Sequence, residues 1–444
     1  MARFFFARIM REIAVDIIRR LTAAGHEAYL VGGCVRDELR GVPPQDYDIA
    51  TSAKPDEVEA LFERTVGVGK KFGVMMVLEG SGEFQVATFR ADAGYDDGRR
   101  PSAVTFSTAR ADAERRDFTV NGLFLDPLTT TLHDWVDGQA DLQARLLRTI
   151  GDPDARFGED HLRLLRVIRF AAQLDFQIEP ATFTAVRAHA EKIQNVSAER
   201  VRDELLKLFR PPHAARGLDL LRDSGLMAQV LPELLPTLDC AQSPEYHPEG
   251  SVYNHIRLGL ESLPVDAHEN LPWTILLHDI AKPATASTSD DGRIHFYAHE
   301  KLGAEMGAKL LKRLRFPRKQ MDDIVFTVRH HMQFKDAPQM RKATLRRMLM
   351  RPTFELELEQ HRLDCLASHG QLDIHRFLKD EQRALAEQPT LLPPLVRGQD
   401  LIDLGITPGP SLGHLLEAIR DLQLAEKLTT REDALAWAKE KTAQ

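Results

Sequence analysis

The spacing of apolar residues changes near residue 150 and divides the chain into two kinds of structure. Before this point short apolar runs alternate with amphipathic stretches, and after it apolar residues recur at helical spacing almost to the end. This pattern predicts an α+β fold, in which a small mixed sheet with flanking helices precedes an all-helical body. The first helix should bury Ile13, Ile17, Ile18 and Leu21. Strands are expected at 28–31, 46–50, 72–78, 84–90 and 121–126.

Proline, glycine and charged residues mark the expected domain boundaries. Gly151-Asp152-Pro153 interrupts the alternating pattern, and the proline-rich stretch 388–394 is typical of a linker. The segment 91–101, rich in Asp, Gly and Arg, is expected to be a mobile loop. The expected domains are a head at 11–150, a helical neck at 151–238, a histidine-rich helical domain at 240–385 and a helical tail at 390–444.

Composition is typical of a globular protein with more than one hydrophobic core. The 444 residues are 43% hydrophobic and 28% charged. Three scattered cysteines fit a reducing cytoplasm, and the apolar patch before Arg8 is too short for a signal or a membrane span, so no membrane partner is expected. The net charge of −8 argues against indiscriminate nucleic-acid binding but is compatible with local basic surfaces.

Two aspartates in one predicted strand indicate a metal site. Asp46 and Asp48 are two positions apart, so both carboxylates should point to the same face. Like charges at this distance repel each other unless a cation lies between them, and Mg²⁺ prefers such carboxylate oxygens together with phosphate. Shortly before the pair, Gly32-Gly33 separates a strand from a helix, where backbone N–H groups can hold a phosphate. Either motif alone is common, but the two together predict a magnesium-dependent nucleotide site.

Two further charged groups suit the same chemistry. Arg115-Arg116-Asp117 places two guanidinium groups, which pair with phosphate oxygens, before a predicted strand. A predicted neck helix carries one aspartate and three arginines at a spacing of three residues, which places them all on one side, opposite the apolar stripe. They are Asp160, Arg163, Arg166 and Arg169. Because Asp accepts from the amino group of cytosine or adenine and Arg donates to ring nitrogens and carbonyls, this side could read a base edge without a nucleic-acid template. By pattern alone, it could equally be a solvated salt-bridge ladder.

In this order, the motifs resemble the class II tRNA nucleotidyltransferases, which are the CCA-adding enzymes and the related bacterial poly(A) polymerases. The resemblance covers the head and neck, about half of the chain. It implies that Asp46 and Asp48 bind catalytic Mg²⁺, that Asp160 and Arg163 pair with CTP and then ATP as an amino-acid template, and that tRNA is the acceptor. The residues that would bind the nucleotide are Gly32, Gly33, Arg36, Asp37, Arg115, Arg116, Asp117, Asn121, Asp160, Arg163, Arg166 and Arg169.

One position departs from the family pattern. Many relatives have Glu at the start of the strand that faces the aspartates, whereas this chain has Gln85. A third carboxylate at the metal is therefore missing there, and Glu83, two residues earlier on the same strand face, is the candidate replacement.

The choice between CCA addition and poly(A) synthesis depends on shorter segments. Gly69-Lys70-Lys71-Phe72 resembles the poly(A) branch, but the strand that follows at 73–77 resembles the CCA-adding branch. The loop 95–101 resembles the flexible segment needed for the switch to ATP, and 397–410 resembles the tail of CCA-adding enzymes. CCA addition is therefore favoured, with an A-adding enzyme or a poly(A) polymerase as the alternative.

A second group of metal-binding residue types lies between residues 246 and 370. An adjacent His-Asp pair offers one metal a nitrogen and an oxygen donor, a combination that suits Mn²⁺, Fe²⁺, Ni²⁺ or Mg²⁺ better than structural Zn²⁺. The order of residues resembles the HD phosphohydrolases, which implies phosphatase or cyclic phosphodiesterase activity unless a degenerate HD fold serves only to bind tRNA. An HD phosphohydrolase whose head merely binds nucleotide is the alternative from another class. The candidate ligands are His255, His278, Asp279, His299, His330, His331 and Asp364.

Overall fold

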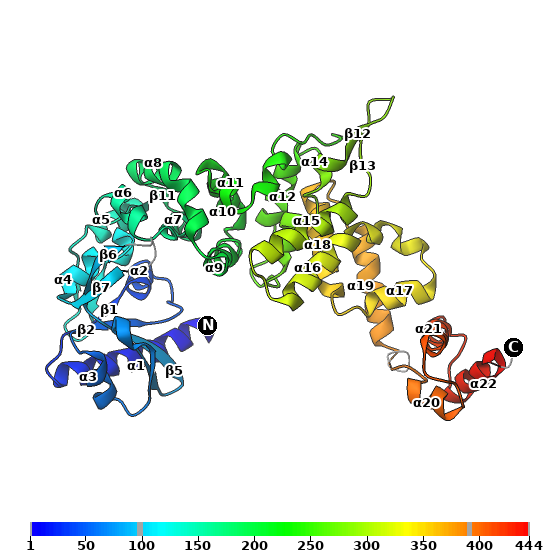
Figure 1. The fold of residues 1–444 in the computed structure, drawn as a ribbon, viewed down its shortest axis with the longest axis horizontal. Helices are drawn as coiled ribbons and strands as arrows, with labels where there is room; N and C mark the ends of the chain where they lie inside the picture. The colour runs from blue at the N-terminus through cyan, green and yellow to red at the C-terminus, as the bar shows by residue number, and fades with distance from the viewer. Residues whose placement is uncertain (1, 96–100, 389–392, 443–444) are drawn as a thin grey trace. The chain divides into compact units, whose positions relative to one another are not determined.

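A computed structural model describes residues 2–95, 101–388 and 393–442 of the chain (Figure 1). Two compact units are present, one formed by Met1–Phe209 with Arg216–Pro232 and the other by Arg210–Ala215 with Glu233–Gln444. The first contains the sheet and the second is almost entirely helical, so the predicted α+β class is confirmed.

The head is built on a seven-stranded mixed sheet with the strand order β3-β4-β5-β2-β1-β8-β9. Among these strands β2 and β5 pair in parallel, and the other neighbours pair antiparallel. The predicted strand at 46–50 begins only at Asp48, and the one at 121–126 begins only at Phe124. The strands are β1 Ala28–Val31, β2 Asp48–Thr51, β3 Thr65–Gly69, β4 Val74–Glu79, β5 Gly82–Thr88, β8 Phe124–Asp126 and β9 Thr131–His133.

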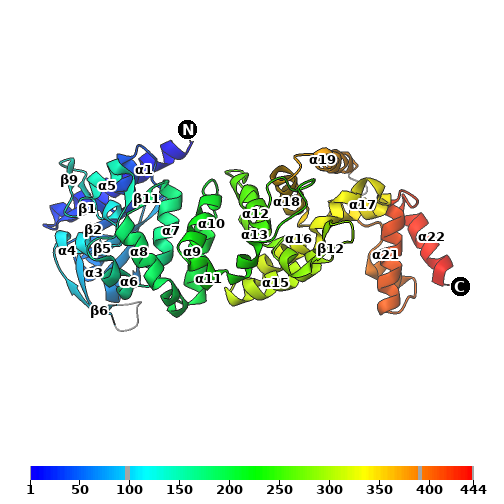
Figure 2. The same cartoon turned by 90° about the horizontal axis from the view of Figure 1, so that it is seen from above.

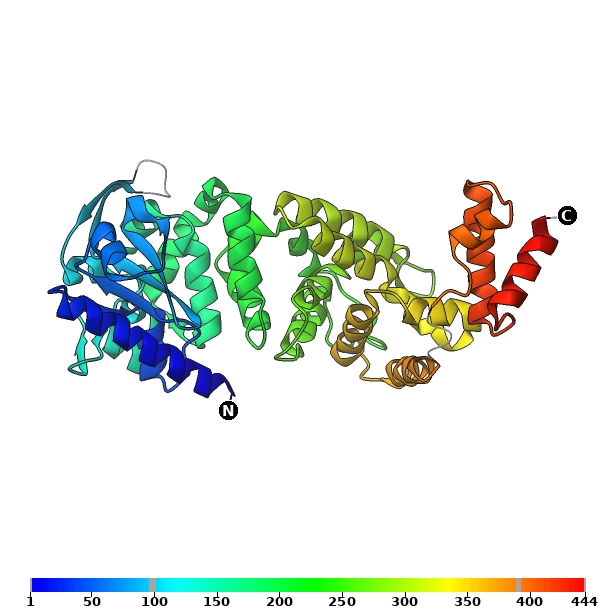
Figure 3. The same cartoon turned by 90° about the horizontal axis from the view of Figure 1, so that it is seen from below.

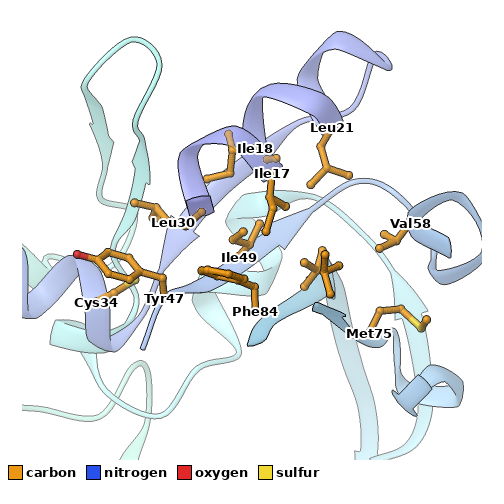
Figure 4. Close-up of a cluster of buried hydrophobic side chains, with 14 of the residues drawn as sticks. Ile17, Ile18, Leu21, Leu30, Cys34, Tyr47, Ile49, Val58, Met75 and Phe84 are labelled. Atoms are coloured by element: carbon orange, nitrogen blue, oxygen red, sulfur yellow. The ribbon is translucent and has the colours of Figure 1, made fainter. Parts of the chain in front are cut away.

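The first helix, α1 (Ala2–Ala23), covers one face of this sheet, as Figure 3 shows in dark blue. Its predicted apolar side is confirmed, because Ile17, Ile18 and Leu21 are fully buried against the strands (Figure 4). Since side chains alternate along a strand, the residues between these core positions face the other side of the sheet. Part of that other face packs in a second apolar cluster that includes Ala50, Phe89 and Phe124, and the rest carries polar residues, among them Asp48.

Shorter elements complete the head. The segment 91–101, which we expected to be a mobile loop, instead contributes to two antiparallel strands whose register pairs Arg90 with Phe106. Its composition lacks alternating apolar residues, so the backbone pairing left no clear sequence signal. Residues 96–100, part of the loop compared with relatives above, lie outside the described residues. The elements are α2 Gly33–Leu39, α3 Pro55–Leu61, η1 Lys70–Phe72, β6 Arg90–Tyr95, β7 Pro101–Phe106, α4 Ala109–Glu114, η2 Thr119–Asn121, α5 Gly138–Ala144 and β10 Leu146–Leu147.

The neck follows the head and belongs to the same compact unit up to Phe209. The helix expected to carry positions 160 to 169 together begins only at Arg163, and Asp160 has an extended backbone with φ −140° and ψ 106°. The single-helix prediction was therefore wrong at its start. The elements are α6 Pro153–Glu159, α7 Arg163–Leu174, β11 Gln177–Ile178, α8 Pro180–His189, η3 Ala190–Asn195, α9 Ala198–Leu208, α10 Ala214–Asp223 and α11 Leu226–Val230.

The second unit contains a helical domain and a helical tail (Figure 2). The tail has its own core around Leu401, Ile419 and Ala434. Among the described helices, none is long and apolar enough to cross a membrane. The elements are η4 Pro232–Thr237, α12 Val252–Glu261, α13 Leu271–Leu277, α14 Lys282–Thr285, β12 Ala286–Thr288, β13 Ile294–Phe296, α15 His299–Arg313, α16 Arg318–His330, η5 His331–Gln339, α17 Lys342–Leu349, α18 Phe354–Ala367, α19 Asp373–Ala386, α20 Gly398–Asp403, α21 Pro410–Leu424 and α22 Arg431–Thr442.

Candidate functional site

The acidic pair lies at the start of β2, on the face of the sheet opposite α1. Tyr47 between the two aspartates is buried in the core under α1, so its neighbours Asp46 and Asp48 are directed the other way. Burial and the negative charge of Asp46 raise the pKa of Asp48 to about 6, against the opposing effect of Arg116. Two carboxylates that resist being charged together form a site that a divalent cation would stabilise.

Gly32 and Arg116 form the second part of this site. Gly32 has φ 75° and ψ −129°, and a Cβ added there would lie 2.9 Å from Nη1 of Arg116. The guanidinium group is held by Asp112, at 3.1 Å, and lies 4.9 Å from the ring centroid of Phe124. The positive charge of Arg116 therefore lies over the backbone of Gly32, which has no side chain, and next to the acidic pair. This arrangement fits a metal-bound triphosphate.

Arg115 makes different contacts from Arg116. Its Nη2 donates to Asp112 at 2.6 Å, and its Nε donates to the backbone carbonyl of Arg90 at 3.0 Å. These bonds connect the end of α4 to β6. The two adjacent arginines cannot be distinguished from the sequence, since only the fold decides which guanidinium reaches Gly32.

A chain of hydrogen bonds links the head to neck helix α7. Arg166 donates to Asp117 through Nε at 2.9 Å and Nη2 at 2.6 Å. Asn121 donates to the other oxygen of Asp117 at 3.1 Å and accepts from Arg36 at 2.7 Å, while Arg36 also donates to Asp37 at 2.9 Å. Burial opposes the charge on Asp117, but Arg166 and Asn121 outweigh it and lower the pKa of that carboxyl to about 2. The network joins five predicted site residues and orients them together.

Asp160 and Arg163, the predicted template pair, project from the junction between α6 and α7. Asp160 accepts from Nη2 of Arg200 at 3.0 Å. Arg163 donates to Glu159 and to the backbone carbonyl of Arg115 at 3.3 Å. Both side chains are therefore held in place, Arg163 by residues of the predicted motifs and Asp160 by Arg200, which the sequence motifs did not indicate. Arg200 and Glu204 lie four residues apart in α9, and this helical spacing was the available signal.

Arg166 and Arg169 are not on a solvated face, as a salt-bridge ladder would require. Arg169 is 7% exposed, donates to Glu204 of α9 at 2.6 Å, and lies 4.0 Å from the ring centroid of Phe170. These arginines connect α7 to the head and to α9, so they stabilise the position of Asp160 and Arg163.

The second unit brings six of the seven predicted HD residues into one buried cluster. Nε2 of His255 lies 3.2 Å from Nε2 of His278, 3.7 Å from Asp279 and 3.0 Å from Asp364. On the other side of Asp279, Nε2 of His299 lies 3.4 Å from its Oδ1.

His299 and His331 complete a second set, with 3.2 Å between their Nε2 atoms and 3.9 Å from His331 to Asp279. The two sets share Asp279, whose Oδ2 faces His255 and His278 and whose Oδ1 faces His299 and His331. In the described residues, His255, His278 and Asp279 form one potential metal-binding group, and Asp279, His299 and His331 form another. Imidazole and carboxylate donors converging in a buried pocket fit a divalent metal.

His330 is a correction to the predicted ligand set. It is half-buried, its Nδ1 lies 2.8 Å from the backbone carbonyl of Phe326, and its ring packs at a tilt against that side chain. Adjacent residues near a helix end point in different directions, so His331 enters the cluster and His330 does not.

The sequence search also missed partners around the cluster. Nδ1 of His255 lies 2.8 Å from Glu249, which also lies 2.9 Å from Nδ1 of His247. Nζ of Lys282 lies 2.7 Å from Asp279. Burial disfavours the charge on Asp279, but His278 and Lys282 hold the pKa of that carboxyl well below its usual range. The carboxylate is therefore ionised and available as a ligand.

Comparison with known proteins places these sites in context. Three family models match: "Poly A polymerase head domain" at 28–148, "Probable RNA and SrmB- binding site of polymerase A" at 175–238, and "HD domain" at 250–367. The CCA-adding enzyme of Levilactobacillus brevis is 32% identical over 96% of this chain and 97% of its own length. That of Geobacillus thermodenitrificans is 46% identical over 48% of this chain and 53% of its own length. The crystal structure of the Bacillus stearothermophilus CCA-adding enzyme in complex with CTP has a TM-score of 0.72 at 27% identity, covering 97% of both chains.

Proposed function

This chain belongs to the CCA-adding enzyme family, and on that premise we propose that it adds C, C and A to the 3′ end of tRNA, from CTP and ATP. The proposal depends on one observation, which is that the acidic pair Asp46 and Asp48 lies beside Arg116, whose guanidinium lies against the backbone of Gly32. Three free cysteines support a cytoplasmic location.

We assign the binding of Mg²⁺ to Asp46 and Asp48. When bound, Mg²⁺ lowers the pKa of the attacking RNA 3′-hydroxyl and neutralises charge on the triphosphate. Arg116 pairs with phosphate oxygens, and the missing side chain of Gly32 leaves room for them. Glu83 and Gln85 are both exposed on the same face of β5, so Glu83 remains our candidate for a third carboxylate.

We assign nucleotide selection to Asp160 and Arg163. Arg200 and Glu159 hold the two side chains, and a rigid pair can present the same donors and acceptors to each incoming base.

The domains we assign are the head at 11–150, the neck at 151–238, the HD domain at 240–385 and an RNA-binding tail at 390–444. The tRNA would be recognised through phosphates and 2′-hydroxyls rather than through its sequence.

The test is incorporation of labelled nucleotides into tRNA that lacks its 3′ CCA. Two additions of CMP followed by a single AMP would support the proposal. A ladder of AMP additions would instead indicate poly(A) synthesis, and AMP addition restricted to tRNA ending in CC would indicate an A-adding enzyme.

A second candidate activity is metal-dependent phosphohydrolysis in the HD domain, favoured by the two ligand sets that share Asp279. We propose that His255, His278, Asp279 and Asp364 hold one divalent metal, and that Asp279, His299 and His331 hold a second. Mn²⁺, Ni²⁺ and Fe²⁺ suit these mixed donors, and Mg²⁺ is the alternative. Such metals activate water for attack on a phosphate ester. Release of phosphate from 3′-phosphorylated or 2′,3′-cyclic nucleotides, measured with each metal in turn, tests this activity.

A further inference from the structure

The polar face of the head sheet continues beyond Asp48 as a row of side chains that reaches the edge strand. Ile49 pairs with Val86 in parallel register, so Gln85 lies beside Asp48. Gln85 pairs with Met76, and Met76 pairs with Val66. Side chains at paired positions of neighbouring strands point to the same face. We call the set of Asp48, Gln85, Met76 and Val66 the open-face row.

This row lies on the side of the sheet opposite α1. The alternate residues on the same strands, including Ile49, Phe84 and Met75, are fully buried in the core under α1 (Figure 4). By contrast Val66 is 49% exposed, Gln85 is exposed and Met76 is half-buried. An exposed valine and a partly exposed methionine in line with a metal-binding carboxylate form an apolar strip that the fold itself does not need.

We propose that the open-face row is the platform on which the 3′-terminal nucleotide of the RNA acceptor lies. The proposal rests on the proposed function, because the 3′-hydroxyl of the acceptor must reach the metal held by Asp46 and Asp48. Three strand spacings of ~4.8 Å give the row a length of about 14 Å, enough for a ribose and its base. The apolar side chains of Met76 and Val66 pack against the base, and the amide of Gln85 bonds to the ribose hydroxyls.

Strand order separates this platform from the site of the incoming nucleotide. Gly32 follows β1, which flanks β2 on one side, whereas β5, β4 and β3 extend from β2 on the other. Arg116 lies over Gly32 and so serves the triphosphate on the β1 side. The two substrates would therefore approach Asp48 from opposite sides, as the transfer of a nucleotide from one to the other requires.

The surroundings of the platform suit single-stranded RNA. Phe72 is 39% exposed and Phe106 is 43% exposed. A Cβ added at Gly73 would lie 3.0 Å from Cε1 of Phe106, so this ring packs against the turn that follows Phe72. Lys71 is exposed in the same turn. Aromatic rings with a nearby cation bind unpaired bases and phosphates without sequence preference. Gln85, unlike a glutamate, adds no negative charge to repel the chain.

The test compares steady-state kinetics of Val66→Glu, Val66→Ala and Met76→Ala with those of Leu128→Glu. Leu128 is a matched control, because it is 39% exposed and lies between β8 and β9, at the opposite edge of the same sheet. We expect Val66→Glu to raise the KM for tRNA lacking CCA by roughly tenfold, since it places a negative charge where RNA lies. The alanine variants should raise it by about threefold, and the KM for CTP should stay within twofold of wild type in all four proteins.

Two results would overturn the platform. One is an RNA KM for Val66→Glu equal to that of Leu128→Glu, and the other is a rise in the KM for CTP instead of the KM for RNA. The alanine variants keep the test valid if Val66→Glu melts at a lower temperature. Failure of the proposed function would look different, because the wild-type protein itself would then add no CMP or AMP to tRNA.

Discussion

Replacing Gly32 by alanine separates the function of its backbone from its role in the fold. The new Cβ would lie 2.9 Å from Nη1 of Arg116, so this guanidinium, rather than a fixed backbone atom, must move. Positive φ at a residue with a side chain costs about 1–3 kcal/mol of stability. Displacing Arg116 from a phosphate removes a charge-assisted hydrogen bond, worth about 1.5–3 kcal/mol. At 1.36 kcal/mol for each factor of ten, we expect kcat/KM for CTP to fall roughly 10- to 150-fold.

Gly41→Ala is the matched control for this variant. Gly41 has φ 71°, close to the 75° of Gly32, but a Cβ added there meets no atom within 4 Å. Both variants should lose free energy of unfolding in urea, whereas only Gly32→Ala should lose kcat/KM for CTP. Equal activity in the two variants would refute the placement of Arg116 at the triphosphate.

Three further variants test the remaining assignments. Asp48→Ala removes a proposed metal ligand on an open face, so CMP incorporation should fall below about one per cent of wild type with unchanged circular dichroism, and higher residual incorporation would count against the metal site. Asp160→Ala should raise incorporation of UMP or GMP relative to CMP in single-nucleotide assays, while an equal loss for all four nucleotides would make Asp160 only a salt-bridge partner of Arg200. The double variant His278→Ala, Asp279→Ala should lose transition metal by elemental analysis and any phosphohydrolase activity but retain CCA addition, and undiminished metal content would contradict the HD ligand set.

Local patterns predicted much of the secondary structure, because the spacing of apolar residues along a strand or helix determines which face of that element each residue occupies. The alternation in Asp46-Tyr47-Asp48 correctly directs the tyrosine into the core. Pro55 begins α3, a position that sequence alone favours because proline is tolerated in the first turn of a helix. The same reasoning failed where tertiary partners override it, as in the β6-β7 pairing and in the extended backbone at Asp160.

The sequence by itself therefore determined the order of the motifs, the α+β division, the family resemblance and the residue types available for chemistry. Only the tertiary structure decided which of these residues meet. It selects Arg116 over Arg115 for the backbone of Gly32 and excludes His330 from the HD cluster. It also aligns Val66 with Asp48 through the register of four strands. These outcomes depend on contacts between residues far apart in the chain, and the free energy of such contacts comes from packing and pairing across the whole sheet or helix bundle, which a local pattern does not contain.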